Sequence, residues 1–68
     1  MTHTKAAKMF DKYPQVQWVA LDTNRHDEHG DPLLVMGRAD RADLEQDVAW
    51  YLTRRPDAAI TYVKRLPN

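Results

Sequence analysis

Apolar residues recur at helical spacing near the start of the chain. Ala6, Met9, Phe10 and Tyr13 stand at i, i+3, i+4 and i+7, which places them on one face of a helix. Pro14 ends this helix, because the residue before a proline is disfavoured in the helical region. A helix of about two turns is marginal in isolation, so we expect its apolar face to pack against another element.

The next two apolar runs, residues 15–22 and 33–38, predict a pair of β-strands joined by a long polar hairpin tip. The first strand carries apolar residues on both faces, which is typical of a central strand. Strict alternation places Val16, Trp18 and Ala20 on one face and Gln17, Val19 and Leu21 on the other.

The clearest helical pattern begins after Asp40, which is a favoured N-cap residue. Its apolar face is formed by Leu44, Val48, Tyr51 and Leu52. Arg54 and Arg55 suit the C-terminal end, where cations are favoured, and Pro56 ends the helix. Residues 58–66 predict a third strand, since β-branched and aromatic residues are frequent there.

The predicted order of elements is α-β-β-α-β, a small α+β fold formed by a single domain of residues 1–68. If the last strand pairs beside the first, the sheet is antiparallel with strand order 2-1-3, and the doubly apolar strand lies in the middle. If it pairs beside the second strand, that pair is parallel. We favour the first arrangement, with helices covering the three-stranded sheet.

The composition, 43% hydrophobic and 29% charged, favours a folded chain, but a domain of 68 residues has a thin core. There is no cysteine to form a disulfide, so good packing, self-association or a partner must supply stability. No apolar run approaches the ~20 residues that span a bilayer, and the N-terminus lacks the apolar stretch of a signal peptide. We therefore expect a cytoplasmic protein without a membrane partner.

Charge is unevenly distributed along this net-neutral chain. Residues 22–47 contain eight carboxylates and three arginines, a net charge of −5, which leaves +5 for the remaining residues. An acidic middle with basic ends can present two faces of opposite sign. The chain is not uniformly basic, as a typical nucleic-acid-binding domain is.

The sequence gives little support for an enzymatic function. Cysteine and serine are both absent, and the two glycines, Gly30 and Gly37, form no phosphate-binding loop. A domain this small also has little room for a pocket of several hundred Å³. We expect neither catalytic activity nor a cofactor.

One segment could bind a metal ion. His26, Asp27, Glu28, His29 and Asp31 lie within six residues, and such nitrogen and oxygen ligands suit Zn²⁺. The spacing matches neither the helical metalloprotease motif nor an EF-hand loop. His26 and His29 are therefore weak metal candidates, and a solvated hairpin tip explains the same residues.

Trp50 lies about 120° around the second helix from Leu44, outside the apolar face. Its neighbours at helical spacing are Asp43, Asp47 and Arg54, and a tryptophan among surface charges is a typical binding anchor. Alternatively, the N-terminal helix covers Trp50 and makes it part of the core, since large exposed aromatics are uncommon on small monomers. On the first interpretation, Asp43, Asp47, Trp50 and Arg54 bind a partner.

A second group of residues suggests a different function. Arg54, Arg55, Lys64 and Arg65 could contact a nucleic-acid backbone, with Tyr62 nearby. No recognised nucleic-acid-binding motif accompanies these residues, and Arg54 and Arg55 already have a structural role at a helix end.

The sequence favours a small binding module that occupies a surface on another protein. Its size and divided charge suit stoichiometric inhibitors and adaptors, such as those encoded by phages and mobile elements, a comparison that rests on composition alone. An acidic helix face could also imitate nucleic acid. The alternatives are direct nucleic-acid binding through the basic ends, and a homodimer formed through an open sheet edge.

Overall fold

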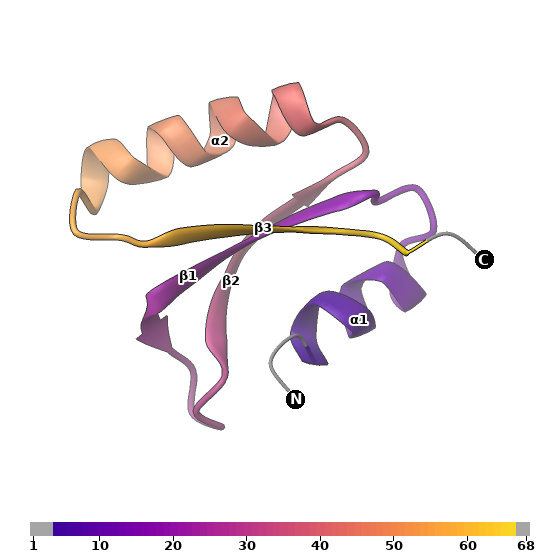
Figure 1. The fold of residues 1–68 in the computed structure, drawn as a ribbon, viewed down its shortest axis with the longest axis horizontal. Helices are drawn as coiled ribbons and strands as arrows, with labels where there is room; N and C mark the ends of the chain where they lie inside the picture. Colours follow the sequence, from indigo (N-terminus) through magenta and orange to yellow (C-terminus); the bar gives the residue numbers. More distant parts are fainter. Residues whose placement is uncertain (1–3, 67–68) are drawn as a thin grey trace.

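Five elements account for most of residues 4–66, the part of the chain that the computed structural model describes (Figure 1). They are α1 (Thr4–Lys12), β1 (Trp18–His26), β2 (Pro32–Arg38), α2 (Arg41–Arg54) and β3 (Ile60–Lys64). Their order is the predicted one. Within the described residues, no helix has the length and apolar character needed to cross a membrane.

The three strands form an antiparallel sheet in the order β2-β1-β3, which confirms the predicted topology. β1 lies in the middle and pairs with both neighbours. Its central residues, Val19 to Leu21, are almost completely buried, because strands flank it and helices cover both of its faces. The apolar character of both faces of β1 therefore has the expected structural cause.

The two helices lie on opposite faces of the sheet, and each encloses its own core (Figure 1). On the α1 side, the buried residues are Ala6, Val16, Val19 and Leu21, with Met9, Phe10, Leu34 and Val63 packed around them. On the α2 side they are Ala20, Leu44 and Val48, with Trp18, Val35, Leu52, Ile60 and Tyr62 around them. The molecule is a three-layer structure with a thin sheet between two helices.

The first strand differs from the prediction at both ends. It begins at Trp18, and Val16 precedes it and packs on the α1 side, opposite to the face that strict alternation gave it. The backbone turns between α1 and β1, with the Val16 amide donating to the Tyr13 carbonyl, so the alternation of a strand does not yet apply. At its other end β1 continues to His26, four residues beyond the predicted limit.

α1 is held against the sheet by two features. Gly37 of β2 lies under the helix, where a Cβ would stand 3.0 Å from Val16 Cγ1 and 3.2 Å from Met9 Cε, so any larger residue would require these side chains to shift by a few tenths of an ångström. Arg65 donates from Nη2 to the carbonyls of Phe10 (2.6 Å) and Tyr13 (3.1 Å). A cation at the C-terminal end of a helix also interacts favourably with its dipole.

α2 begins as predicted, with Asp40 as its N-cap. The Asp40 side chain accepts a hydrogen bond from the Ala42 amide at 3.2 Å. At the other end, the Arg55 amide donates to the Tyr51 carbonyl, and Pro56 follows. The helix therefore ends at the position predicted from Pro56.

Candidate protein-binding face

Trp50 lies on the surface of α2 with 61% of its area exposed. Leu44 and Val48 occupy the face of α2 that packs on the sheet, and both are buried. α1 does not cover Trp50, because α1 packs on the opposite face of the sheet (Figure 1). Of the two alternatives for this residue, the structure therefore selects the exposed one.

The four residues predicted to bind a partner form a single stripe along α2. Asp43, Asp47, Trp50 and Arg54 stand at i, i+4, i+7 and i+11, so each lies about one turn from the next. The Arg54 guanidinium lies 4.4 Å from the centre of the Trp50 ring, a cation–π contact that restricts the orientation of the indole.

Beside this stripe the surface has a shallow hollow of about 160 Å³ between α2 and β2, bordered by Trp50. Val35 and Met36 line its β2 side, and Met36 is 39% exposed. The hollow and Trp50 together make an apolar centre. We call this surface the Trp50 face and define it as Asp43, Asp47, Trp50 and Arg54 of α2 with Val35 and Met36 of β2.

A β-bulge explains why two consecutive residues of β2 contribute to the same face. Met36 pairs with Ala20 and Leu34 pairs with Leu21, so Val35 is an extra residue without a partner on β1. Met36 shares the α2-facing side of the sheet with Ala20, and Val35 also packs on that side. The sequence carries no mark of this bulge, and sequence analysis missed both residues.

The charges around the Trp50 face are of both signs. Asp47 accepts two hydrogen bonds from Arg38, at 2.7 and 3.3 Å, and this pairing raises the pKa of the Arg38 guanidinium. The nearby Glu45 is paired with Arg41 at 2.9 Å. Within residues 4–66, Asp43 has no ion-pair partner within 4.0 Å, although its charge contributes to the raised pKa of the Arg38 guanidinium. The helix face is mixed rather than acidic.

The basic residues of the nucleic-acid alternative are divided between two ends of the molecule. Arg54 and Arg55 lie where α2 ends, whereas Lys64 is the last residue of β3 and Arg65 follows it at the far end of that strand (Figure 1). The five residues of β3 separate the pairs by roughly 15 Å, at ~3.3 Å per residue. Arg65 is also occupied by the carbonyls at the end of α1. These four residues do not form one patch.

The hairpin tip is organised by one carboxylate. Asp27 accepts hydrogen bonds from the amides of His29 (2.8 Å) and Asp31 (3.1 Å), and its other oxygen pairs with Lys5 of α1. The Lys5 ammonium lowers the pKa of Asp27 to about 2, and the two amides add to this effect. Gly30 takes a positive φ of 82° in the same turn, a conformation that favours glycine.

The two histidines of this tip do not converge on a shared site. His26 ends β1, and His29 is exposed, with Nε2 3.7 Å from Glu28 Oε1. In the described part of the chain, no three histidine or carboxylate side chains come together as metal ligands would. The structure shows a polar turn at this position, held by the hydrogen bonds and the ion pair of Asp27.

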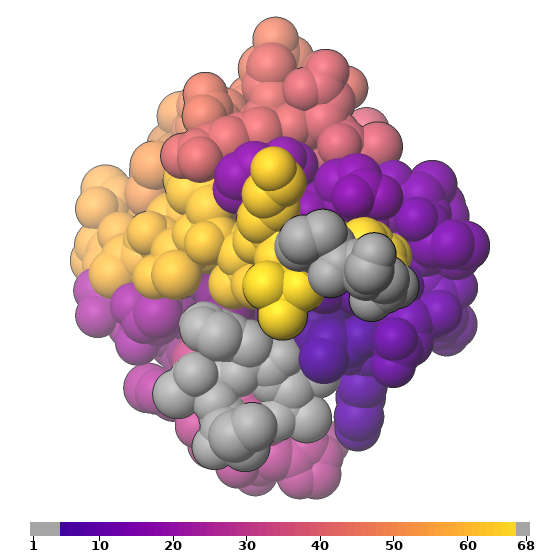
Figure 2. All heavy atoms as spheres, turned by 45° about the vertical axis from the view of Figure 1, so that its right-hand side comes forward, coloured from indigo at the N-terminus to yellow at the C-terminus, as the bar shows by residue number. Residues whose placement is uncertain are grey.

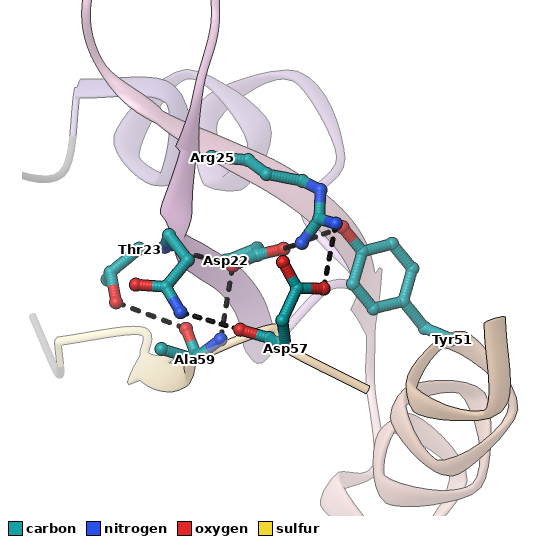
Figure 3. A network of polar contacts seen from close by, with 7 residues as sticks. Asp22, Thr23, Arg25, Tyr51, Asp57 and Ala59 are labelled. Atoms are coloured by element: carbon teal, nitrogen blue, oxygen red, sulfur yellow. Dashed lines mark hydrogen bonds and ion pairs between the residues drawn. The ribbon is translucent and has the colours of Figure 1, made fainter. Parts of the chain in front are cut away.

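Sequence analysis also missed a buried polar network centred on Asp22 (Figure 3). The carboxylate is fully buried and accepts four hydrogen bonds. One oxygen accepts from the amides of Asn24 (3.0 Å) and Ala59 (3.2 Å), and the other from the Tyr51 hydroxyl (2.8 Å) and Arg25 Nη1 (2.9 Å). The network joins the end of β1, the last turns of α2 and the segment before β3.

The hydrogen bonds of this network keep the buried Asp22 carboxyl ionised. Burial by itself would raise the pKa of the Asp22 carboxyl, but the four hydrogen bonds outweigh burial and leave the pKa below its usual value. Burial and the hydrogen bond to Asp22 raise the pKa of the Tyr51 hydroxyl. Arg25 also pairs with Asp57 at 2.9 Å. Each oxygen of Asp22 thus accepts two hydrogen bonds, and the buried charge is fully paired. A carboxylate on the inward face of an apolar strand could have indicated this network.

Comparison of the chain with protein-family models, curated proteins and solved structures found no match. The functional interpretation therefore depends on the geometry of the residues themselves.

Proposed function

We propose that this protein is a non-enzymatic binding module that acts stoichiometrically, as an inhibitor or adaptor, by docking its Trp50 face on another protein. The observation that supports this proposal is the exposure of Trp50, at 61%, beside the half-exposed Met36 and a hollow. Binding hot spots are enriched in tryptophan and arginine, and they lie in an apolar centre surrounded by polar residues. Trp50 with Arg54 over its ring, inside a rim of charged side chains, has this composition.

The charge pattern favours a protein partner over imitation of nucleic acid. Arg38, Arg41 and Arg54 lie among the carboxylates of the helix face, whereas a nucleic-acid mimic needs uninterrupted negative charge. The Asp43 carboxylate, which has no ion-pair partner within 4.0 Å among residues 4–66, suits contact with a cation of the partner, and such a pair mainly raises the association rate. The cytoplasmic location and a phage or mobile-element origin remain predictions.

The proposal is tested by affinity capture from cells of the native host, comparing the wild type with Trp50→Ala and Asp43→Lys. Asp43→Lys is preferred to a change at Asp47, which would also break the ion pair with Arg38. Tyr13→Ala is the matched control, because Tyr13 is another aromatic residue, 40% exposed, and directly follows α1, the helix on the opposite face of the sheet. Circular dichroism verifies that each variant remains folded.

We expect the wild type and Tyr13→Ala to retain the same protein and Trp50→Ala to lose it. With the purified partner, Trp50→Ala should raise the Kd about 30-fold, the effect of a hot spot of about 2 kcal/mol. Equal retention by all variants would show that binding uses another surface. Retention of nucleic acid alone, by every variant, would replace the proposal with the nucleic-acid alternative.

A further inference from the structure

The outer edge of β3 presents backbone groups that pair with no other strand in residues 4–66. The Thr23 amide donates to the Ala59 carbonyl, and the Arg65 amide donates to the Gln17 carbonyl, both at 2.8 Å. In an antiparallel pair, alternate residues direct their hydrogen-bonding groups toward the neighbouring strand. Residues 59, 61, 63 and 65 therefore face β1, and Ile60, Tyr62 and Lys64 direct N–H and C=O groups outward.

The other edge of the sheet has features that oppose pairing, and β3 has almost none. β2 begins with Pro32, which has no N–H to donate, and the bulge at Val35 interrupts its regular spacing. Proline and bulges are devices by which proteins protect exposed edges. The five residues of β3 contain neither, and their single charge is Lys64 at the end of the strand. β3 is thus the open edge.

The helices leave this edge accessible. α2 packs mainly against β1 and β2, and α1 also lies toward β2, so residues Ile60 to Val63 are only half-buried. A hollow of about 380 Å³ lies between α1 and β3, with Ala6, Phe10 and Val63 among the residues that line it. Leu66 borders the same hollow and is 81% exposed. Figure 2 shows β3 on the surface between α2 and α1.

We propose that β3 pairs with β3 of a second copy of this chain, antiparallel and with a two-fold axis at Tyr62. Ile60 and Lys64, the other two residues whose backbone groups point outward, lie two positions before and after Tyr62. The two-fold axis therefore pairs Tyr62 with Tyr62 of the second copy, and Ile60 with Lys64 of the second copy. Six backbone hydrogen bonds then form, and the two sheets become one of six strands. Leu66 and the apolar hollow add contact beside the strands.

Size and charge are compatible with this dimer. The five residues of β3 extend over roughly 15 Å, at ~3.3 Å per residue, so a β3–β3 pair forms an interface at the small end of the range for specific complexes. The chain has zero formal net charge, so two copies do not repel each other as a whole. The Trp50 face adjoins β2, at the opposite edge of the sheet, so the dimer carries two such faces directed away from each other.

Sedimentation of the full chain tests the dimer directly. With a dissociation constant of about 1–100 µM, which suits an interface at the small end of the range, the mass should rise with concentration from 7.9 kDa toward twice that value. The chain contains no natural cysteine, so engineered disulfides can test the register. At the axis, the two Cα atoms of residue 62 lie about 5.5 Å apart, within the range that a disulfide spans.

We expect Tyr62→Cys to form a disulfide-linked dimer under mild oxidation, and Lys64→Cys and Met36→Cys not to do so. Because Tyr62 packs on the α2 side, its replacement can destabilise the fold. A mixture of Ile60→Cys and Lys64→Cys provides a second test, with a crosslink between the two variants and none within either; Ile60 also packs on the α2 side, so circular dichroism verifies that each variant is folded. A wild type that stays monomeric above about 500 µM, or crosslinking at Met36 instead, overturns the proposal. If the protein stays monomeric, the expected partner of the β3 edge becomes an extended segment of another protein.

Discussion

The hydrogen bond from Tyr51 to Asp22 allows the buried network to be tested with the removal of one oxygen atom. Tyr51→Phe keeps the ring in place and removes only the hydroxyl, which donates to Asp22 Oδ2 at 2.8 Å. A hydrogen bond to a charged group contributes about 1.5–3 kcal/mol. Asp22 Oδ2 keeps its bond from Arg25, so no acceptor is left without a partner, and we expect the lower end of this range, about 1.5 kcal/mol.

This loss is large for so small a protein. A domain of this length has a total stability of roughly 3–10 kcal/mol, and a change of about 1.5 kcal/mol lowers the Tm by roughly 6–12 °C. Urea unfolding followed by tryptophan fluorescence and by circular dichroism gives the free energy of unfolding. The control is Tyr13→Phe, because the Tyr13 side chain is 40% exposed and should change stability by less than about 0.5 kcal/mol. Equal stabilities of Tyr51→Phe and the wild type would refute the role assigned to the network.

Three further predictions concern the packing of α1 and the buried carboxylates. Gly37→Ala should lower the free energy of unfolding by about 1–2 kcal/mol in a urea titration, because its Cβ would come within 3.0 Å of Val16 Cγ1; an unchanged or higher value would contradict the close packing. Arg65→Gln should speed amide exchange in α1 by about tenfold and leave β1 protected, since Arg65 links the helix end to the sheet; equal exchange would show that this link is not needed. The carboxyls of Asp22 and Asp27 have lowered pKa values, so their stabilisation is complete above about pH 4, the ordinary range of an aspartate, and decreases as the pH falls below it, for Asp27 through a pKa of about 2; urea titrations that give constant stability as the pH falls would exclude their contribution.

The main features of the fold follow from local patterns in the sequence. The apolar spacing in α2 and the cap at Asp40 define that helix, and both are determined by residues within a few positions. The two apolar faces of β1 predict a central strand, which leaves the order β2-β1-β3 as the favoured topology. The ends of β1 were predicted less well, because contacts with distant segments decide them. The Thr23 amide, for example, donates to the Ala59 carbonyl and extends the strand.

The candidate site was predicted in part. The stripe from Asp43 to Arg54 follows from helical geometry alone, but the exposure of Trp50 does not. Whether Trp50 is covered depends on which face of the sheet α1 occupies, and that depends on the space above Gly37 and on the reach of Arg65. The contribution of Met36 depends on a bulge that the alternation of residues does not reveal.

The sequence by itself determined the elements, their order and the absence of the usual nucleophiles, because each depends on residue types or on neighbours along the chain. The tertiary structure decided which surfaces remain free. Asp22 and Arg65 look like ordinary surface charges in the sequence, and folding uses both to join distant segments. Residues 4–66 leave Trp50 and the outer edge of β3 uncovered for the same physical reason: a sheet of three strands and two helices has too few elements to cover every apolar and hydrogen-bonding surface that it presents.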